Sequence, residues 1–404
     1  MKRQFLCAGL WAVVCFAVQS CGITELYKID GDDKNGVWNG PAANPSPTYQ
    51  TITYVSAFDY PDGYDWQSDP DRGHVRCSLV VFREGVPVLK VPVGNEYNVS
   101  PDPDMHRILD GQLYTDFSEG SETMLKKNGK PVLSYPAAEM ICDLKVVDSD
   151  IYTLGHSRSG KGFSLRLNGD VLLEREAGYT FERILMEEKS PGVAFAEPIV
   201  SSAGTVERYY VMRGGKVSQV ALRDDIKKVW DVAVYDDEVY YLASLTGVAA
   251  PVLVSSKGMT TLQMPSSMAV VSCRMNILEG GICVEGVLAK DNQVQSVVWG
   301  TDLKYSLFPK GMIFSALCAG EDGLHCTMNP ASGTGAGLIF RGGEGLEIPS
   351  GYACMSRSAM AFASGMLTVG LSSLNGNRPA LWVDGKLREF DVNGYISCVA
   401  IVTL

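Results

Sequence analysis

The stretch DVAVYDDEVYYLASLTGVAAPVLVSSKGMTTLQ, residues 231–263, decides the fold. It contains four short segments in which apolar residues alternate with other residues, which is the pattern of half-buried β-strands. Asp236-Asp237 separates the first two segments, and Lys257-Gly258 separates the last two. These turn residues tolerate the positive φ angles that two-residue hairpin turns require. The stretch therefore predicts one sheet of four antiparallel strands.

A turn like that at Gly258 recurs at nearly constant intervals of 40 to 46 residues. The turns contain Gly85, Gly129, Gly169, Gly215, Gly258, Gly343 and Gly385, with Asp302 in the one gap. A four-stranded unit of this length cannot bury its apolar faces alone, so it stacks against similar units, as in a β-propeller. The spacing predicts one all-β domain over residues 49–404, an eight-bladed β-propeller. The alternative is seven blades, if the weakest unit, residues 274–308, is not a blade.

The first unit lacks its first strand. Residues 51–55, 76–82 and 86–91 supply strands two to four of that unit, and nothing with the strand pattern precedes them. The last ten residues, 395–404, form a strand without a unit. We therefore expect the C-terminal segment to pair with residues 51–55, because closing the ring removes both open sheet edges.

Residues 1–20 are predicted to be a secretory signal peptide. Lys2 and Arg3 precede an apolar run from Phe5 to Val18, which is too short to span a membrane. The sequence Val18-Gln19-Ser20-Cys21 resembles the lipobox of bacterial lipoproteins. That resemblance implies cleavage before Cys21 and lipidation of Cys21, while the alternative is soluble export with cleavage nearby.

The segment that starts at Cys21 has the composition of a tether. Residues 21–48 show no apolar period and contain many Gly, Pro, Asn and Asp residues, which interrupt strands and helices. Because no aspartate follows Cys21, the resemblance to lipoproteins implies the outer membrane or the cell surface of a Gram-negative bacterium. We therefore expect the propeller to meet the membrane through its lipid anchor only.

The charge of the chain disfavours nucleic acid as a partner. Removal of residues 1–20 takes the net charge from −11 to −13, and the longest basic runs are pairs such as Lys126-Lys127. A polyanion-binding surface needs a basic stripe instead. The four histidines have no metal-ligand spacing. We therefore expect neither a metal nor a cofactor.

Eight cysteines remain in the mature chain besides Cys21, and most lie inside apolar segments. They are Cys77, Cys142, Cys273, Cys283, Cys318, Cys326, Cys354 and Cys398. None shows CxxC spacing, so most are predicted to be buried free thiols that act as small core residues. Cys318 and Cys326 flank one predicted hairpin and are the best candidates for a disulfide.

The repeats resemble those of the uncharacterised β-propeller lipoproteins of Bacteroidetes. In that family a strand that begins with Asp and a strand that contains Tyr precede a turn of Asn-Gly or Asp-Gly. The matching residues are Asp143, Tyr152 and Asn168-Gly169, then Asp231 and Tyr240, then Trp382 and Asp384-Gly385. The resemblance covers residues 49–404 and implies a fold but no activity.

Ligand-binding residues are predicted on the long loops, which emerge together on one rim of a propeller. The longest loop, residues 59–72, contains Tyr60, Tyr64, Asp65 and Trp66. Aromatic rings beside carboxylates suit sugar rings. The alternative is that the aromatic rings fold back and cover the first blade.

A second loop, residues 155–162, adds His156 and Arg158 to the predicted rim. Its Gly and Lys residues lack the order of a phosphate-binding P-loop, so it has the features of a solvated hairpin loop.

These features predict a lipid-anchored cell-surface protein that binds a glycan or a protein, with no catalytic residue assigned. The alternative is a carbohydrate-active enzyme, a glycosidase or lyase, that uses acids facing the channel, for which Asp143 and Asp231 are the candidates. These aspartates could instead accept hydrogen bonds from turns or from a neighbouring blade. A structural role in an outer-membrane assembly is a third alternative.

Overall fold

The computed structural model describes residues 51–403 apart from short gaps. The gaps are residues 70–74, 94–105, 120, 137–138, 158–161, 188–189, 202–203, 221–222, 224, 266, 279–280, 292, 321–322, 334, 342–343, 375 and 377. The predicted signal peptide, Cys21 and the tether up to residue 48 lie outside the described residues, as do Arg158 and Gly343.

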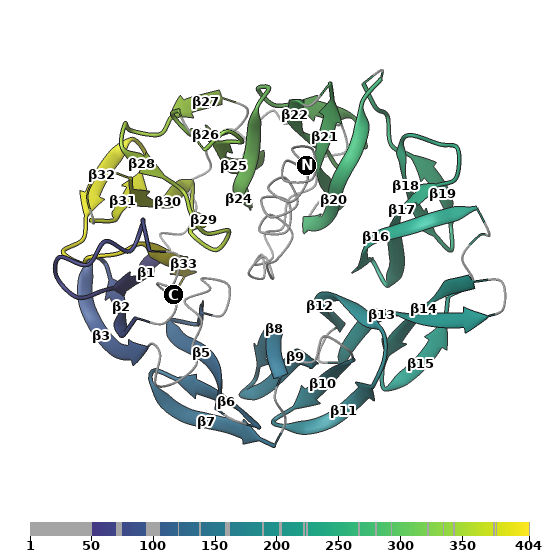
Figure 1. Ribbon diagram of the computed structural model, residues 1–404, viewed down its shortest axis with the longest axis horizontal. Coiled ribbons are helices and arrows are strands. Elements are labelled where there is room, and N and C mark those ends of the chain that lie inside the picture. Colours follow the sequence, from purple (N-terminus) through teal and green to yellow (C-terminus); the bar gives the residue numbers. More distant parts are fainter. Residues whose placement is uncertain are drawn as a thin grey trace, which may run out of the picture.

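The described residues form eight antiparallel sheets arranged as blades around a central axis (Figure 1). The predicted all-β, eight-bladed propeller is therefore confirmed. Its first blade has the order β3(Val86–Val93), β2(Cys77–Arg83), β1(Thr51–Asp59) and β33(Ile396–Thr403). No helix in the described part of the chain is long and apolar enough to span a membrane.

The next six blades each contain four consecutive strands. Their bounds are β4(His106–Leu109), β5(Gln112–Glu119), β6(Glu122–Lys127) and β7(Lys130–Tyr135); β8(Glu139–Val147), β9(Asp150–Ser157), β10(Phe163–Leu167) and β11(Asp170–Arg175); β12(Tyr179–Glu187), β13(Ser190–Ser201), β14(Gly204–Arg213) and β15(Lys216–Gln219); β16(Ile226–Tyr235), β17(Glu238–Leu245), β18(Pro251–Ser255) and β19(Gly258–Thr261); β20(Ala269–Leu278), β21(Gly281–Lys290), β22(Gln293–Trp299) and β23(Tyr305–Leu307); β24(Met312–Gly320), β25(Gly323–Pro330), β26(Leu338–Arg341) and β27(Glu344–Glu347).

The eighth blade differs from the others because two short strands share its inner position. Both β28(Tyr352–Ala353) and β29(Met360–Ala363) pair with β30(Met366–Ser373), which continues to β31(Ala380–Val383) and β32(Lys386–Glu389). The weakest unit of the sequence pattern, residues 274–308, forms most of blade six. In its turn from Gly300 to Leu303, the residue with the positive φ, 60°, is Leu303 rather than a glycine. Eight blades are therefore present rather than seven.

The ring closes as the sequence predicts. Strand β33 pairs antiparallel with β1, from Thr51 opposite Thr403 to Ser56 opposite Cys398. The buried Ser56 and Ser397 hydroxyl oxygens lie 2.7 Å apart at the register shift near the end of this pairing. The last strand of the chain thus completes the first blade.

The chain order of the strands gives the ring two distinct faces. Turns between the first and second strands, and between the third and fourth, lie on one face, which we call the short-turn face. The other connections lie on the long-loop face. Positive φ angles at Gly85, Gly129 and Gly385 explain the repeated glycines, because L side chains rarely adopt that conformation.

Apolar side chains from facing blades form the core between them. The eight cysteines among the described residues are all buried and unbonded, which confirms the prediction of free thiols. The proposed Cys318–Cys326 disulfide is wrong. Cys318 stands opposite His325, and Cys326 stands opposite Leu317, so the two thiols point to opposite faces of the hairpin.

Candidate functional site

The aromatic loop of the first blade is not a surface for stacking ligands. Trp66 is 0% exposed and Tyr60 is 2% exposed, and both belong to the core of blade one. The Trp66 ring packs 5.0 Å from Tyr395 and 6.5 Å from Tyr60. The two rings fold back over the blade, so the prediction that they face a ligand is wrong.

Polar groups fix this loop to the closing segment of the chain. The Asn393 side-chain amide donates to the carbonyls of Pro61, at 2.7 Å, and Tyr64, at 3.1 Å. The half-buried Tyr64 donates its hydroxyl to Asp69. Exposed Asp65 accepts hydrogen bonds from Ser68, which lower its pKa. Asp65 and Tyr64 therefore stabilise the loop itself.

Asp143 joins three consecutive blades. Its Oδ2 accepts the backbone N–H of Ile184 in blade four at 2.7 Å, and its Oδ1 accepts Arg107 of blade two at 2.7 Å. Burial alone would raise the pKa of Asp143, but the charges of Arg107 and Lys145 and the Ile184 hydrogen bond lower it overall. The carboxylate is fully buried and occupied as an interblade acceptor.

Asp231 repeats this arrangement two blades further on. It accepts the Met275 N–H of blade six at 2.8 Å and the Arg183 guanidinium of blade four at 3.3 Å. Arg183 also donates to the Met275 carbonyl at 2.9 Å. Of the two sequence-based alternatives for these aspartates, the structure favours hydrogen bonding to a neighbouring blade.

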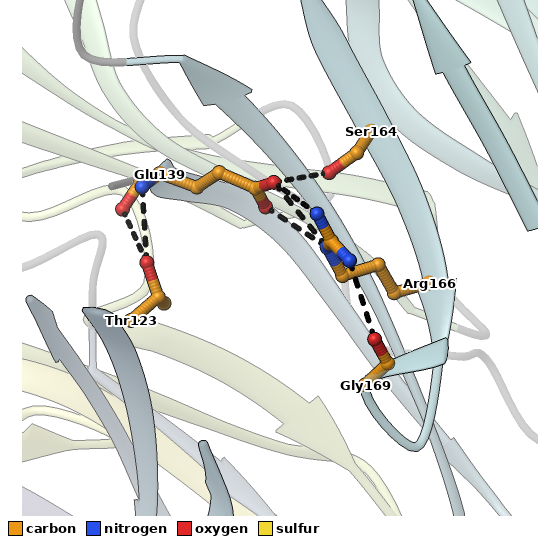
Figure 2. Close-up of polar contacts among 5 residues, drawn as sticks. All are labelled: Thr123, Glu139, Ser164, Arg166 and Gly169. Carbon is orange, nitrogen blue, oxygen red and sulfur yellow. Dashed lines mark hydrogen bonds and ion pairs between the residues drawn. The ribbon is translucent and has the colours of Figure 1, made fainter. Parts of the chain in front are cut away.

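Figure 2 shows a buried ionic network at the start of blade three, around Glu139. Glu139 accepts Arg166 at 2.7 Å and Ser164 at 2.6 Å through Oε1. Its backbone N–H donates to Thr123 Oγ1 of blade two at 3.0 Å. Arg166 donates in turn to the Gly169 carbonyl. The network therefore connects the start of β8 to blade two through Thr123 and to the β10–β11 hairpin of its own blade through Arg166.

His156 lies beside this network and contacts the next blade. Its Nε2 is 3.1 Å from Thr180 Oγ1. Burial lowers the pKa of His156, although the charge of Glu139 opposes this, so the ring is neutral at pH 7. Thr180 Oγ1 also accepts the Glu182 N–H at 3.2 Å, which leaves the hydroxyl hydrogen for the histidine. Arg158, predicted beside His156, lies outside the described residues.

A bulge in the inner strand β12 follows Thr180. Thr180 pairs with Phe195 and Ile184 with Val193, so residues 181–183 stand opposite Ala194 alone. Glu182 in this bulge has a φ of 54°, which is strained for a residue with a side chain. Bulges of this kind redirect side chains, often beside functional sites.

The environment of Glu182 favours its neutral form. Burial raises the pKa of Glu182 most, the Arg274 charge opposes this, and the Asp231 charge raises the pKa further. Because Arg274 and Asp231 belong to blades six and five, Glu182 lies where three blades meet. Such a carboxyl suits proton donation to a ligand.

Beside the bulge lies a group of residues that we call the aromatic rim. It consists of exposed Tyr179, half-buried Phe181, buried Tyr209 and the carboxylate of Glu207. Both tyrosine hydroxyls donate to Glu207 Oε2, Tyr179 at 3.0 Å and Tyr209 at 2.7 Å. The Phe181 ring centre lies 6.0 Å from that of Tyr179 and 6.4 Å from that of Tyr209. Tyr179 is 37% exposed. The rim therefore presents a ring face next to an acidic acceptor.

A cation from blade five lies close to the aromatic rim. Lys228 Nζ is 3.6 Å from the centre of the Trp230 ring, a cation–π contact. Burial lowers the pKa of Lys228, and the charges of Cys273 and Glu207 oppose this. Aromatic faces, an acceptor and a donor thus occur together on the long-loop face.

Sequence reasoning missed the aromatic rim. Tyr179 and Phe181 lie in an apolar strand pattern, and Glu207 lies on a different strand. The charged residues that precede Tyr209, at positions 207 and 208, were the available signal. In the parts of the chain that the structure describes, no group of three His, Cys, Asp or Glu side chains could hold a metal.

No family model and no curated protein sequence matches the chain. Solved structures that match include the propeller domain of the trilobed protease from Pyrococcus furiosus, at 11% identity and a TM-score of 0.44, covering 74% of this chain and 91% of that one. Oligogalacturonate lyase in complex with manganese matches at 10% identity and a TM-score of 0.45, covering 85% and 98%. Dihydro-heme d1 dehydrogenase NirN matches at 12% identity and a TM-score of 0.48, and the match covers 86% of this chain and 74% of that one. These likenesses concern the fold.

Proposed function

We propose that this protein is a lipid-anchored binding protein of the outer membrane or cell surface that holds a glycan on its long-loop face. Residues 1–20 would direct export and Cys21 would carry the lipid, as the sequence pattern indicates. The propeller would then present its rim to a ligand. A protein ligand at the same rim is the alternative within this function.

The aromatic rim supports the glycan best. The 37% exposed Tyr179 ring offers an apolar face, and Glu207 beside it offers carboxylate oxygens. Sugar rings present apolar C–H faces and a border of hydroxyls, so stacking and hydrogen bonding can act together. Because burial raises the pKa of Tyr179 and Tyr209, both hydroxyls stay protonated and hold Glu207 in place.

Binding of the chain from residue 22 onward to a glycan array tests this proposal. We expect Tyr179→Ala to weaken binding of the glycan with the strongest signal by about fivefold, since stacking of one aromatic ring contributes about 1 kcal/mol. Tyr305→Ala is the matched control, because Tyr305 is also 37% exposed but lies on the outer strand β23. Absence of binding to any glycan, or equal loss in both variants, would refute the glycan proposal.

Glu182 favours a second candidate function, a carbohydrate-active enzyme. Its raised pKa and its position near Asp231 suit a general acid. If the protein is such an enzyme, it converts a bound glycan to product. Glu182→Gln should then abolish the conversion while the glycan still binds. Chromatography of the glycan after incubation measures this, and an unchanged glycan supports binding alone.

A further inference from the structure

A cleft opens between blades two and three on the short-turn face, away from the aromatic rim. Its volume is about 390 Å³, within the range of small-molecule sites. It is lined by Leu109, Asp110, Gln112, Tyr114, Lys127, Val132, Val146, Ser149 and Ile151. Among the described residues, the hydrophobic core between these blades is small, with Tyr114, Leu125, Ile141 and Leu144 as its buried side chains. The facing sheets therefore leave room for a ligand there.

The lining of the cleft combines an apolar floor with charges of both signs. Val132, Val146 and Ile151 provide aliphatic surface. Lys127 Nζ lies 5.7 Å from the centre of the Tyr114 ring, and Asp110 supplies a carboxylate to the same cleft. A ligand that carries one positive and one negative group on an apolar body would complement all of these features.

A hydrogen bond between two side chains holds one polar group of the cleft in place. The Asn128 side chain donates to Gln112 Oε1 at 2.7 Å, so the Gln112 amide is held with its N–H₂ group as the remaining donor. Ser149 has a φ of 82° because it is the second residue of the two-residue turn between β8 and β9.

We propose that this cleft binds a free α-amino acid with an apolar side chain, in its zwitterionic form. Its carboxylate would accept hydrogen bonds from Lys127 and Gln112, and its ammonium group would donate to Asp110. Its side chain would rest against Val132 and Ile151. Complementarity to the two charged groups on the α-carbon and the small volume favour this ligand over an extended polymer.

Calorimetric titration of the full chain with L-phenylalanine tests the proposal. We expect L-phenylalanine to bind. N-acetyl-phenylalanine, which lacks the ammonium group, and phenylalanine amide, which lacks the carboxylate, should each bind about tenfold or more weakly. Lys127→Met should weaken phenylalanine about tenfold, and Lys130→Met, an exposed lysine of the same hairpin outside the cleft, should not. No detectable binding would overturn the proposal.

Asp110→Asn tests recognition of the ammonium group separately from recognition of the carboxylate. Asparagine tolerates the φ of 47° at this position, so the turn is retained. We expect this variant to lose affinity for phenylalanine but not for N-acetyl-phenylalanine. Equal affinity of the variant and the native chain for phenylalanine would overturn the assignment. Tyr179→Ala should leave this binding unchanged, so the result does not depend on the aromatic rim.

Discussion

Glu139 shows, at the scale of single residues, how a charge can be buried in this propeller. Its side chain is 8% exposed and that of Arg166 is 9% exposed, with 2.7 Å between the paired atoms. The Arg166 guanidinium also lies 4.5 Å from the centre of the Tyr135 ring. Removing one charge of such a pair leaves the other without compensation in a poorly solvated site.

We predict that Glu139→Gln lowers the free energy of unfolding by about 2–4 kcal/mol. Adding Arg166→Met should restore part of this loss, because the stranded charge is then removed. Glu197→Gln is the matched control, because the Glu197–Arg175 pair is 25% and 34% exposed and should cost less than about 1 kcal/mol. Urea denaturation measures all four proteins. A loss at Glu139 no larger than at Glu197 would contradict this account.

Single residues were the least predictable level of the site. Trp66 and Tyr179 both occur beside acidic or polar residues in the sequence. Trp66 is buried because Tyr395, more than three hundred residues away, packs against it, and no local pattern records that contact. Tyr179 is exposed because it starts an inner strand at the blade edge.

At the scale of strands, Asp143 and Asp231 hold neighbouring inner strands together. Each accepts a backbone N–H from the following blade. Hydrogen bonding and the Arg107 charge outweigh the effect of burial and lower the pKa of Asp143. A lowered pKa in the folded state means that the carboxylate stabilises the fold at neutral pH.

We predict that Asp143→Asn destabilises the protein most at neutral pH. The native contribution is complete above the unfolded pKa of about 3.9 and is lost as the pH falls through the lower folded pKa. The difference in the free energy of unfolding between the variant and the native chain should therefore shrink below about pH 4. The urea concentrations at the midpoint of unfolding, measured for both proteins at pH 7 and pH 3, test this difference. Asp236→Asn, in an exposed turn, is the control, and a pH-independent difference for Asp143→Asn would contradict the linkage.

The strands themselves were largely predictable from sequence, because alternating apolar residues and positive-φ turns are local signals. The Asp236-Asp237 turn, with φ angles of 52° and 57°, is one example. The bulge at residues 181–183 could not be predicted, since these residues continue an ordinary strand pattern. Its cause is the register that β13 imposes on β12.

At the scale of the whole molecule, closure couples the first and last strands of the chain. The period of about 40 residues and the unpaired C-terminal segment predicted this closure, and β33 pairs with β1 accordingly. Repeat units each contact mainly their neighbours, so their stabilities combine along the ring. Opening the β1–β33 pairing would expose two sheet edges at once.

We predict that Ser56→Cys combined with Ser397→Cys locks the ring through a disulfide and stabilises it by about 2–4 kcal/mol. The two hydroxyl oxygens are 2.7 Å apart and buried, and the bond would close a loop of most of the chain. Cys283 and Cys354 should not compete, because burial raises the pKa of Cys283 to about 12 and of Cys354 to about 11, which keeps both protonated.

Denaturation of the double variant with and without a reductant measures this effect. The reduced form serves as the control, since it carries the same substitutions without the bond. If oxidation leaves stability unchanged, unfolding does not require separation of β33 from β1, and the blades must then unfold while that pair stays intact. A gain confined to the oxidised form would show that separation of these two strands is part of global unfolding.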